Sequence, residues 1–332
     1  MTALITGATG FLGAALTGRL LADGKRVRIL VRSLNKAESL IAAGADAVVG
    51  DVTDPAAVRA ALEGVTVVYH LAGKLLIPGV PAGEYQRTNL EGTRVVVVAC
   101  QDHPGLERLV HCSTTGVLGE TGAQPADENA AMRPTNVYEA SKAEAELVVR
   151  QAMRRGLPAV IVRPGLVYGP GDLHLLGFFR SILRHQFRPI GRRPVWLHPI
   201  YVGDLLDGLV QCGEKAAALG ECFHIAGPER VTLEALAGEI ARAEGTALPT
   251  GRIPLAAART LALIGDLLPP KWRRSAPLTR SRLDFLTHSR IYASERAERL
   301  LGFRAAIDLR TGLARTVDWY REHGYLANAA AA

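Results

Sequence analysis

Two side chains near the middle of the chain have the types and the spacing of an acid/base pair. Tyr138 and Lys142 lie four residues apart in the segment YEASK, so on a helix they share one face, about one turn apart. Tyrosine, with an ordinary pKa of about 10, is a poor base at neutral pH, but a neighbouring ammonium group favours the phenolate. The pair could therefore move a proton at a substrate oxygen, and the lysine could also hold a cofactor ribose.

Three hydroxyl side chains precede this pair in the segment HCSTTG: Ser113, Thr114 and Thr115. They come directly after a predicted strand, where a hydroxyl group can donate a hydrogen bond to the substrate oxygen. The residues alone do not choose among the three.

A glycine-rich segment, TGATGFLG at residues 6–13, follows the first predicted strand and opens the first predicted helix. Of Gly7, Gly10 and Gly13, one permits the tight turn, another lets the backbone approach a pyrophosphate, and the last allows close helix packing. The anion would lie at the helix N-terminus. The segment predicts a dinucleotide site.

The second predicted strand ends at Arg32, where an acidic residue would hold a ribose diol. An arginine suits a 2′-phosphate instead, and Lys36 could assist it, which favours NADP over NAD. Alternatively, Arg32 stacks on the adenine. Asp51, in GDVTD, could accept a hydrogen bond from the adenine amino group, although an aspartate after a strand is also an ordinary turn or capping residue.

Strands and helices alternate through the first half of the chain. Longer helical segments, such as 13–23, 55–63, 89–101 and 138–155, separate short β-branched runs. These runs are residues 2–6, 26–32, 46–50, 65–71, 107–113 and 158–163. The alternation predicts an α/β fold of the Rossmann type, a doubly wound parallel sheet covered on both faces.

After Arg163 the alternation weakens, which predicts two domains. Residues 1–164 form the dinucleotide-binding domain, to which 200–227 return as a helix and a strand. Residues 165–199 and 228–325 form a smaller, mostly helical substrate lobe near the strand C-termini, and 326–332 form a tail.

Composition narrows the class of protein. The 332 residues are 48% hydrophobic, and the four cysteines lack metal-ligand or disulfide-framework spacing, so we expect no metal site and a reducing cytoplasm. We expect no signal peptide and no membrane-spanning helix. Within the net charge of +7, residues 249–315 hold thirteen basic and five acidic residues. This basic segment could face phosphates or anionic lipid, or form a solvated surface, but it lacks a nucleic-acid recognition motif.

Six motifs occur together along the chain: TGATGFLG at 6–13, HLAG at 70–73, NLEGT at 89–93, CSTTGVLG at 112–119, YEASK at 138–142 and RPGLVYGP at 163–170. Together they resemble the extended short-chain dehydrogenase/reductase family, also described as the NAD-dependent epimerase/dehydratase family, and most of all its 3β-hydroxysteroid dehydrogenase-like members. The resemblance implies that Tyr138 is the acid/base, that Lys142 supports it, and that Thr114 takes the substrate-hydroxyl position, with Ser113 as its neighbour.

The resemblance also implies a cofactor site, with Asn89 beginning the helix behind it and residues 164–167 bordering the nicotinamide. The residues expected to contact the cofactor are Gly7, Thr9, Gly10, Phe11, Leu12, Gly13, Arg32, Asp51, Val52, Leu71, Ala72, Gly73, Asn89, Tyr138, Lys142, Pro164, Gly165 and Val167. We expect a homodimer.

The favoured function is a dehydrogenase or reductase that acts on the hydroxyl or carbonyl group of a fairly apolar small molecule. Leu118 replaces an aromatic residue that is common in the family, which makes the site less suited to a sugar. The first alternative is a nucleotide-sugar epimerase or dehydratase in which Arg192, Arg193 or Arg290 grips a diphosphate. The second is a non-catalytic NADP-binding redox sensor.

The C-terminal segment IPLAAARTLALIGDLLPP resembles that of the hydroxysteroid-dehydrogenase-like members. On a helix, Leu261, Ile264 and Leu268 would lie together, opposite Arg259 and Asp266. This face could pack on its own domain, cover an apolar ligand or contact a membrane surface. We expect His70 and His111 to be packing residues, and His198 could line the pocket.

Overall fold

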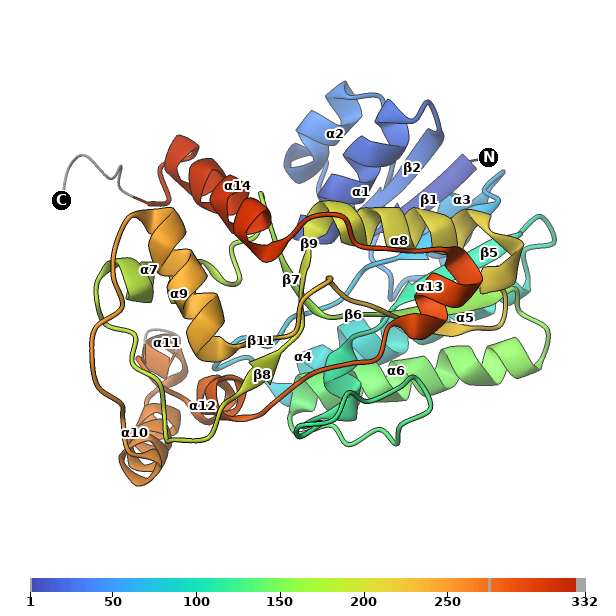
Figure 1. Ribbon diagram of the computed structural model, residues 1–332. Coiled ribbons are helices and arrows are strands. Elements are labelled where there is room, and N and C mark those ends of the chain that lie inside the picture. Colours follow the sequence, from blue (N-terminus) through green and yellow to red (C-terminus); the bar gives the residue numbers. More distant parts are fainter. Residues whose placement is uncertain (1, 274–275, 327–332) are drawn as a thin grey trace.

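A seven-stranded parallel sheet forms the centre of the larger domain (Figure 1). The computed structural model describes residues 2–273 and 276–326, so the predicted tail lies outside the described residues apart from Leu326. The strands are β1 (Thr2–Thr6), β2 (Arg26–Val31), β3 (Asp46–Val49), β4 (Val67–His70), β5 (Arg108–Cys112), β6 (Ala159–Pro164) and β10 (Cys222–Ile225). Their order is β3-β2-β1-β4-β5-β6-β10, and every pair is parallel. The prediction of a Rossmann-type doubly wound sheet is confirmed.

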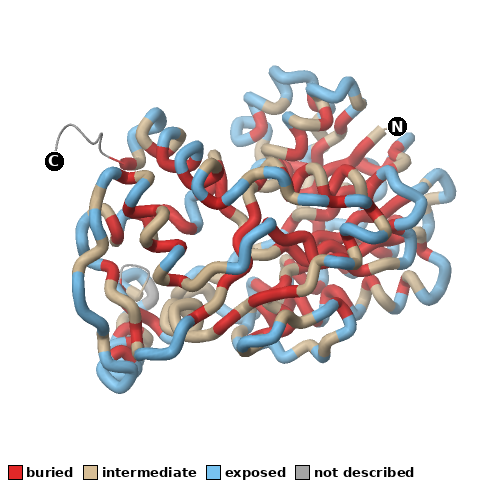
Figure 2. Tube along the Cα trace, viewed as in Figure 1, coloured by how far each residue is buried: buried red, intermediate tan, exposed pale blue. Residues whose placement is uncertain are grey.

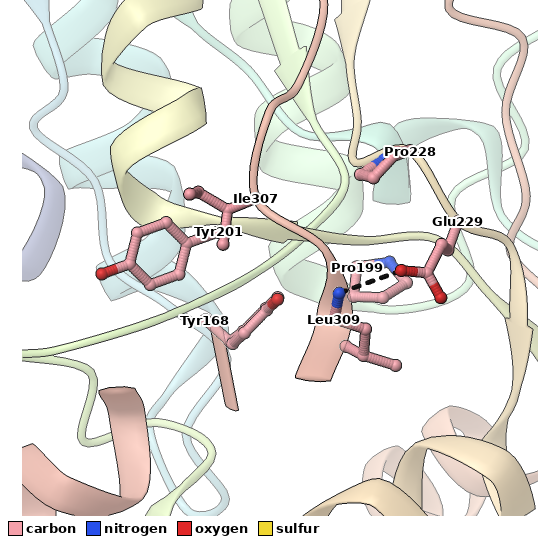
Figure 3. A pocket seen from close by; sticks show the side chains of 7 residues that line it. All are labelled: Tyr168, Pro199, Tyr201, Pro228, Glu229, Ile307 and Leu309. Atoms are coloured by element: carbon pink, nitrogen blue, oxygen red, sulfur yellow. Dashed lines mark hydrogen bonds between the residues drawn. The ribbon is translucent and has the colours of Figure 1, made fainter. Parts of the chain in front are cut away.

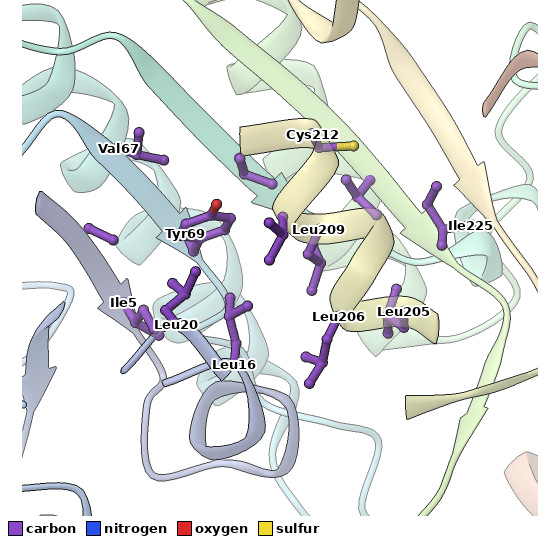
Figure 4. Close-up of a cluster of buried hydrophobic side chains, with 14 of the residues drawn as sticks. Ile5, Leu16, Leu20, Val67, Tyr69, Leu205, Leu206, Leu209, Cys212 and Ile225 are labelled. Carbon is purple, nitrogen blue, oxygen red and sulfur yellow. The ribbon is translucent and has the colours of Figure 1, made fainter. Parts of the chain in front are cut away.

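Helices cover both faces of this sheet, as the uninterrupted apolar strands require. On one face, α1 (Phe11–Ala22) and α8 (Val202–Glu214) pack against the sheet through Leu16, Leu20 and Leu209 (Figure 4). On the other face lie α3 (Pro55–Leu62), α5 (Gly92–Gln101) and α6 (Val137–Arg154). The strand order reverses between β1 and β4, and sheets of this kind usually bind ligands at the C-terminal ends of the strands beside such a reversal.

The helix behind the predicted site begins earlier than the sequence indicates. It runs from α4 (Ala82–Tyr85) through a π-helical turn (Gln86–Glu91) into α5. Asn89 therefore lies within the π-helical turn, and the expectation that it begins the helix is wrong. Single π-helical turns of this kind occur mostly at functional sites.

The smaller lobe is mostly helical, with its own apolar core (Figure 2). Phe179, Ile240, Leu313 and Tyr320 are among the buried residues of this core. Its helices are α7 (Leu176–Leu183), α9 (Leu233–Glu244), α10 (Leu255–Leu267), α11 (Pro270–Arg273), α12 (Arg280–Thr287) and α14 (Leu309–Glu322). Two short sheets, β7 (Leu166–Tyr168) with β9 (Pro199–Tyr201) and β8 (Trp196–Leu197) with β11 (Val231–Thr232), connect the lobe to the larger domain. Over residues 2–273 and 276–326, no helix combines the length and the apolarity needed to cross a bilayer.

One helix of the C-terminal segment does not belong to the lobe. Helix α13 (Glu295–Leu301) buries Ala297, Leu301 and the following Phe303 in the same core as α1 and α8. The predicted lobe of 228–325 is therefore interrupted, because these apolar residues cover the edge of the sheet at β10.

Candidate active site

The predicted site residues gather where β1, β4, β5 and β6 end. The glycine loop follows β1, Leu71 follows β4, Ser113 follows β5, and Pro164 is the last residue of β6. Because β1 and β4 flank the reversal of strand order, these segments lie at the position where α/β sheets usually bind ligands.

The glycine loop has no room for side chains at two positions. Gly7 has a φ of +75°, and a Cβ atom there would lie 2.7 Å from the backbone nitrogen of Ala72. A Cβ atom on Gly13 would lie 2.1 Å from the carbonyl oxygen of Gly7. Helix α1 begins after Gly10 without a side-chain cap, so its first N–H groups remain available to an anion. These features fit the pyrophosphate of a dinucleotide.

The adenine end of this site carries the predicted charged residues. Arg32 is 75% exposed, and its Nη1 lies 3.9 Å from Oδ2 of Asp51. Partial burial opposes ionisation of Asp51, but hydrogen bonds from Thr53 and the charges of Arg32 and Arg87 lower its pKa below the ordinary value. Asp51 is therefore an ionised acceptor at neutral pH, and Arg32 is an exposed cation beside it.

The first turn of α6 positions the tyrosine. Asn136 caps the helix by accepting a hydrogen bond from the backbone N–H of Glu139 at 3.0 Å, and this places Tyr138 one residue inside the helix. Lys142 is buried one turn later, and its Nζ donates to the carbonyl oxygen of Cys112 at 2.6 Å. Burial lowers the pKa of Lys142.

Burial raises the pKa of Tyr138 above its ordinary value, and a hydrogen bond with Thr114 opposes this only in part. The phenol of the ligand-free protein is therefore protonated at neutral pH. The expectation that Lys142 favours the phenolate stays a prediction, and Nζ of this lysine donates to the carbonyl oxygen of Cys112. A protonated phenol is the form that donates a proton to a carbonyl oxygen.

The structure separates the two hydroxyl candidates. Ser113 is buried, and its Oγ donates to Oε2 of Glu146 at 2.8 Å. Thr114 lies beside the phenol of Tyr138, and its Oγ1 also accepts from the backbone N–H of Gly116. Thr114 is therefore available to a substrate oxygen, whereas the expected second role of Ser113 conflicts with its bond to Glu146.

Glu146 and Arg163 form a buried ion pair behind these residues. Arg163 Nη2 lies 2.7 Å from Oε1 of Glu146, and Arg163 Nε lies 3.0 Å from Oε2. Both side chains are buried, and this bidentate pair links α6 to β6. Glu146 lies one helical turn after Lys142, so the pair also fixes the face of α6 that carries the catalytic residues.

Replacing Glu146 with glutamine should cost about 3–5 kcal/mol of unfolding free energy, because it leaves the Arg163 charge buried without a counter-charge. Urea unfolding measures this change. Glu144→Gln, on an exposed position of the same helix, is the matched control. A loss no larger than that of the control would contradict the prediction.

The stabilisation by Glu146 should also depend on pH. Burial raises the pKa of this carboxyl, but hydrogen bonds and charge from Arg163, with help from Arg150 and Ser113, give a net lowering. The contribution is therefore fully present above the unfolded-state pKa of about 4.3 and is lost as the pH falls through the lower folded-state value. In Glu146→Gln, this acid-sensitive part of the stability should be missing.

Asn89 joins three parts of the site. Its Oδ1 accepts from the backbone N–H of Lys74 at 2.7 Å, and its Nδ2 donates to Oγ of Ser141 at 2.9 Å. Ser141 in turn donates to the carbonyl oxygen of Tyr138. Sequence reasoning missed Ser141, although it lies inside YEASK, and it missed Lys74.

The histidines near the site stay neutral. His70 lies between the hydroxyl groups of Thr6 and Thr93, and burial lowers its pKa to about 3. Burial also lowers the pKa of His111 well below its ordinary value, and that of His198 to about 4. None of these three is therefore an acid/base group near neutral pH.

The remaining predicted cofactor residues lie at or shortly after the ends of β1, β3, β4 and β6. Ala72 lies against Gly7, and Gly73 is close to Nζ of Lys142. Thr9, Phe11 and Leu12 belong to the glycine loop and the start of α1, Val52 follows β3, and Gly165 and Val167 follow β6.

Arg290, predicted as one grip for a diphosphate, is held internally. It is largely buried and pairs with Asp284 at 2.5 Å and with Glu139 at 3.3 Å. Its charge is therefore balanced by two carboxylates. Arg192 and Arg193 are exposed.

A shallow depression lies where α14 meets β7 and β9 (Figure 3). It is lined by Tyr168, Pro199, Tyr201, Pro228, Glu229, Ile307 and Leu309. Glu229 accepts a hydrogen bond from the backbone N–H of Leu309, so its carboxylate is used to start α14. None of the predicted catalytic residues lines this depression.

The glycine loop follows a strand that flanks the reversal of strand order, and the tyrosine/lysine pair lies beside it. This combination is typical of nicotinamide-dependent enzymes that act on hydroxyl or carbonyl groups. The chain belongs to the NAD dependent epimerase/dehydratase family, whose model matches residues 3–226. The prediction of an extended short-chain dehydrogenase/reductase is thereby confirmed.

Several proteins named for an enzymatic activity are similar to this chain over nearly its whole length. It is 29% identical over 324 residues to the 4-hydroxy-2-methyl-3-oxo-4-farnesyl-3,4-dihydroquinoline-1-oxide ketoreductase of Stigmatella aurantiaca, covering 94% of this chain and 95% of the relative. It is 30% identical to a 2-alkyl-3-oxoalkanoate reductase of Stenotrophomonas maltophilia, covering 95% and 98%. Among solved structures, DesIV from Streptomyces venezuelae, a dTDP-glucose 4,6-dehydratase with NAD bound, is 25% identical with a TM-score of 0.78, covering 99% and 100%. The family thus includes both reductases and dehydratases.

Proposed function

We propose that the protein is an NADPH-preferring reductase of an apolar ketone. The observation that carries this proposal is the exposure of apolar side chains on the two segments that hold site residues. Leu75 and Ile77, which follow Gly73 and Lys74 in the chain, are exposed, and so is Val137, next to Tyr138. An apolar substrate would cover these side chains and remove them from water.

Two further observations support an apolar substrate. The charge of Arg290 is already balanced by Asp284 and Glu139, so binding a diphosphate there would require breaking buried ion pairs. By their names, the two reductases described above act on a farnesyl-bearing ketone and on alkyl-substituted oxoacids.

In this proposal, Thr114 and Tyr138 bind and protonate the carbonyl oxygen of the substrate. Thr114 donates a hydrogen bond to it, and the protonated phenol of Tyr138 gives it a proton as it becomes an alcohol. Lys142 holds the cofactor ribose, and Asn89 fixes the loop after β4 against α6. The bound cofactor supplies the hydride.

A substrate panel tests the proposal. The purified protein would be incubated with NADPH and either a 2-alkyl-3-oxoalkanoate, a sterol ketone, a dihydroflavonol or UDP-glucose. We expect loss of NADPH absorbance with at least one apolar ketone and none with the sugar nucleotide. Sugar epimerisation or dehydration without net cofactor consumption would replace the proposal with the first alternative, and tight NADPH binding without any turnover would replace it with the redox sensor.

The cofactor preference gives a separate prediction. Arg32 can pair with a 2′-phosphate, and a charge-assisted hydrogen bond contributes about 1.5–3 kcal/mol, so NADPH should bind roughly tenfold to a hundredfold more tightly than NADH. Arg32→Asp should reverse the preference in titrations of both cofactors. Arg26→Asp, at the other end of β2, makes the same change in charge and should leave it unaltered. Equal dissociation constants in the parent protein would contradict the assignment.

A homodimer and a cytoplasmic location also remain predictions, and light scattering of the purified protein tests the first.

A further inference from the structure

Helix α10 packs with its small residues inward. Ala258, Ala262 and Gly265 are its buried residues, at a spacing that forms one helical stripe. A Cβ atom on Gly265 would lie 2.0 Å from the carbonyl oxygen of Leu278, so the two backbones are in close contact there. The helix is therefore held to the lobe by backbone proximity and small side chains.

Its large apolar residues point outward instead. Leu261, Leu263 and Ile264 are about half exposed, Leu267 is 84% exposed, and Trp272 of α11 is 59% exposed. These five side chains are named the α10 face. Leu268, which the sequence placed with Leu261 and Ile264, is half-buried at the end of the helix, and Leu267 takes its place. An ordinary surface helix has the opposite arrangement, and a clustered apolar surface marks a binding site.

Basic residues occur on the same two helices as the α10 face. Between residues 255 and 280 the sequence has five basic residues and one acidic residue, Asp266. Arg259 and Lys271 are exposed, and Nζ of Lys271 lies 5.8 Å from the ring centre of Trp272. Tryptophan and lysine side by side, with leucines on the same surface, are typical of segments that lie in a membrane interface.

We propose that the α10 face binds the surface of a bilayer that contains anionic lipids. Its apolar side chains would enter the headgroup region, while Arg259 and Lys271 would interact with the lipid phosphates. A second copy of this chain fits less well, because a two-fold contact through this face would bring like charges together.

Contact of the α10 face with a bilayer would bring the enzyme to apolar ketones that are dissolved in lipid. This inference rests on the proposed function. Helices α10, α11 and α12 gather at one end of the lobe (Figure 1), where the surface around α10 is exposed (Figure 2). Helix α10 packs on α12, and Asp284 of α12 pairs with Arg290, which also contacts Glu139 beside Tyr138. Contacts therefore link α12, on which α10 packs, to the segment that carries Tyr138, and an apolar ketone could reach the enzyme from lipid.

Vesicle sedimentation tests the proposal with the full chain. We expect the parent protein to bind phosphatidylcholine vesicles that contain phosphatidylglycerol more tightly than vesicles without it, and to be released at high salt. Leu261→Ser/Ile264→Ser/Leu267→Ser should reduce this binding at least about tenfold. Arg259→Gln/Lys271→Gln should reduce it roughly thirtyfold, since each of the two basic residues near an anionic surface contributes about 1 kcal/mol.

The control is Val98→Ser/Leu147→Ser/Leu219→Ser, which removes three exposed apolar side chains from the larger domain and should leave vesicle binding unchanged. Because all the replaced side chains are exposed, thermal unfolding should be similar for each variant. The triple α10 variant should turn over a short, water-soluble ketone as fast as the parent protein does. If the parent protein itself shows no turnover, the proposed function fails, whereas the vesicle-binding result is independent of turnover.

Three results would overturn the proposal. The parent protein could fail to bind anionic vesicles at low salt, or the triple α10 variant could bind them as well as the parent. Alternatively, the triple variant could convert a dimeric parent into a monomer while neither binds vesicles, in which case the α10 face is a contact between copies of this chain.

Discussion

Tyr138→Phe should lower kcat at least about a hundredfold, the low end of the effect of removing a general acid, and should leave the dissociation constant of the cofactor within about twofold. The phenol is the group at the site whose proton can reach a substrate oxygen, because His70, His111 and His198 are buried and neutral. The ring itself stays in place on α6, so cofactor binding by the glycine loop and Lys142 should persist.

Steady-state kinetics with an apolar ketone, together with a cofactor titration, measures both quantities. Tyr325→Phe makes the same chemical change at a partly buried position of the smaller lobe and should leave both unaltered. If Tyr138→Phe had a kcat near that of the parent protein, Tyr138 would not be the proton donor.

The pH dependence follows from the same residue. Burial raises the pKa of Tyr138, so the phenol stays protonated through neutral pH and reduction should fall only as the pH rises toward that raised value. Oxidation of the product alcohol needs the phenolate and should therefore rise over the same range. The two opposite profiles should disappear in Tyr138→Phe.

The central sheet could be predicted from the sequence because each of its strands is marked by the residues of that strand and of the turn after it. Each strand is a short β-branched run that ends at a turn residue, and residues 158–163, for example, correspond to β6 at Ala159–Pro164. The glycine loop is equally local, since Gly7 and Gly13 must lack side chains whatever surrounds the domain. The rules for βαβ connections predict parallel strands with helices on both faces of the sheet.

The parts that could not be predicted depend on contacts between distant segments. The π-helical turn at Asn89 accompanies bonds to Lys74 and Ser141, which the motif NLEGT does not encode. The return of α13 to the sheet depends on β10. The direction of the α10 face depends on the approach of Gly265 to Leu278, and the periodicity of leucines within one helix does not reveal which side is buried.

The choice between Ser113 and Thr114 also could not be predicted from the sequence. These two residues are adjacent at the end of β5, but their side chains contact different groups. Ser113 donates to Glu146, whose other contacts are with Arg163 and Arg150. Thr114 lies instead beside the phenol of Tyr138. Ser113 therefore supports a buried ion pair, and Thr114 is the residue that can reach the substrate oxygen.

Thr114→Val should consequently lower kcat by roughly a hundredfold or more, the effect expected when one donor to a developing oxyanion is removed. Thr114→Ser keeps the hydroxyl group and should retain most of the activity. Ser113→Ala should leave kcat within a few fold of the parent value and instead cost about 1.5–3 kcal/mol of unfolding free energy, because it removes a hydrogen bond to a buried carboxylate. Kinetics and urea unfolding of the three variants separate these roles. If Ser113→Ala lost turnover and Thr114→Val did not, Ser113 would have to leave Glu146 when substrate binds, and the assignment of Thr114 would be wrong.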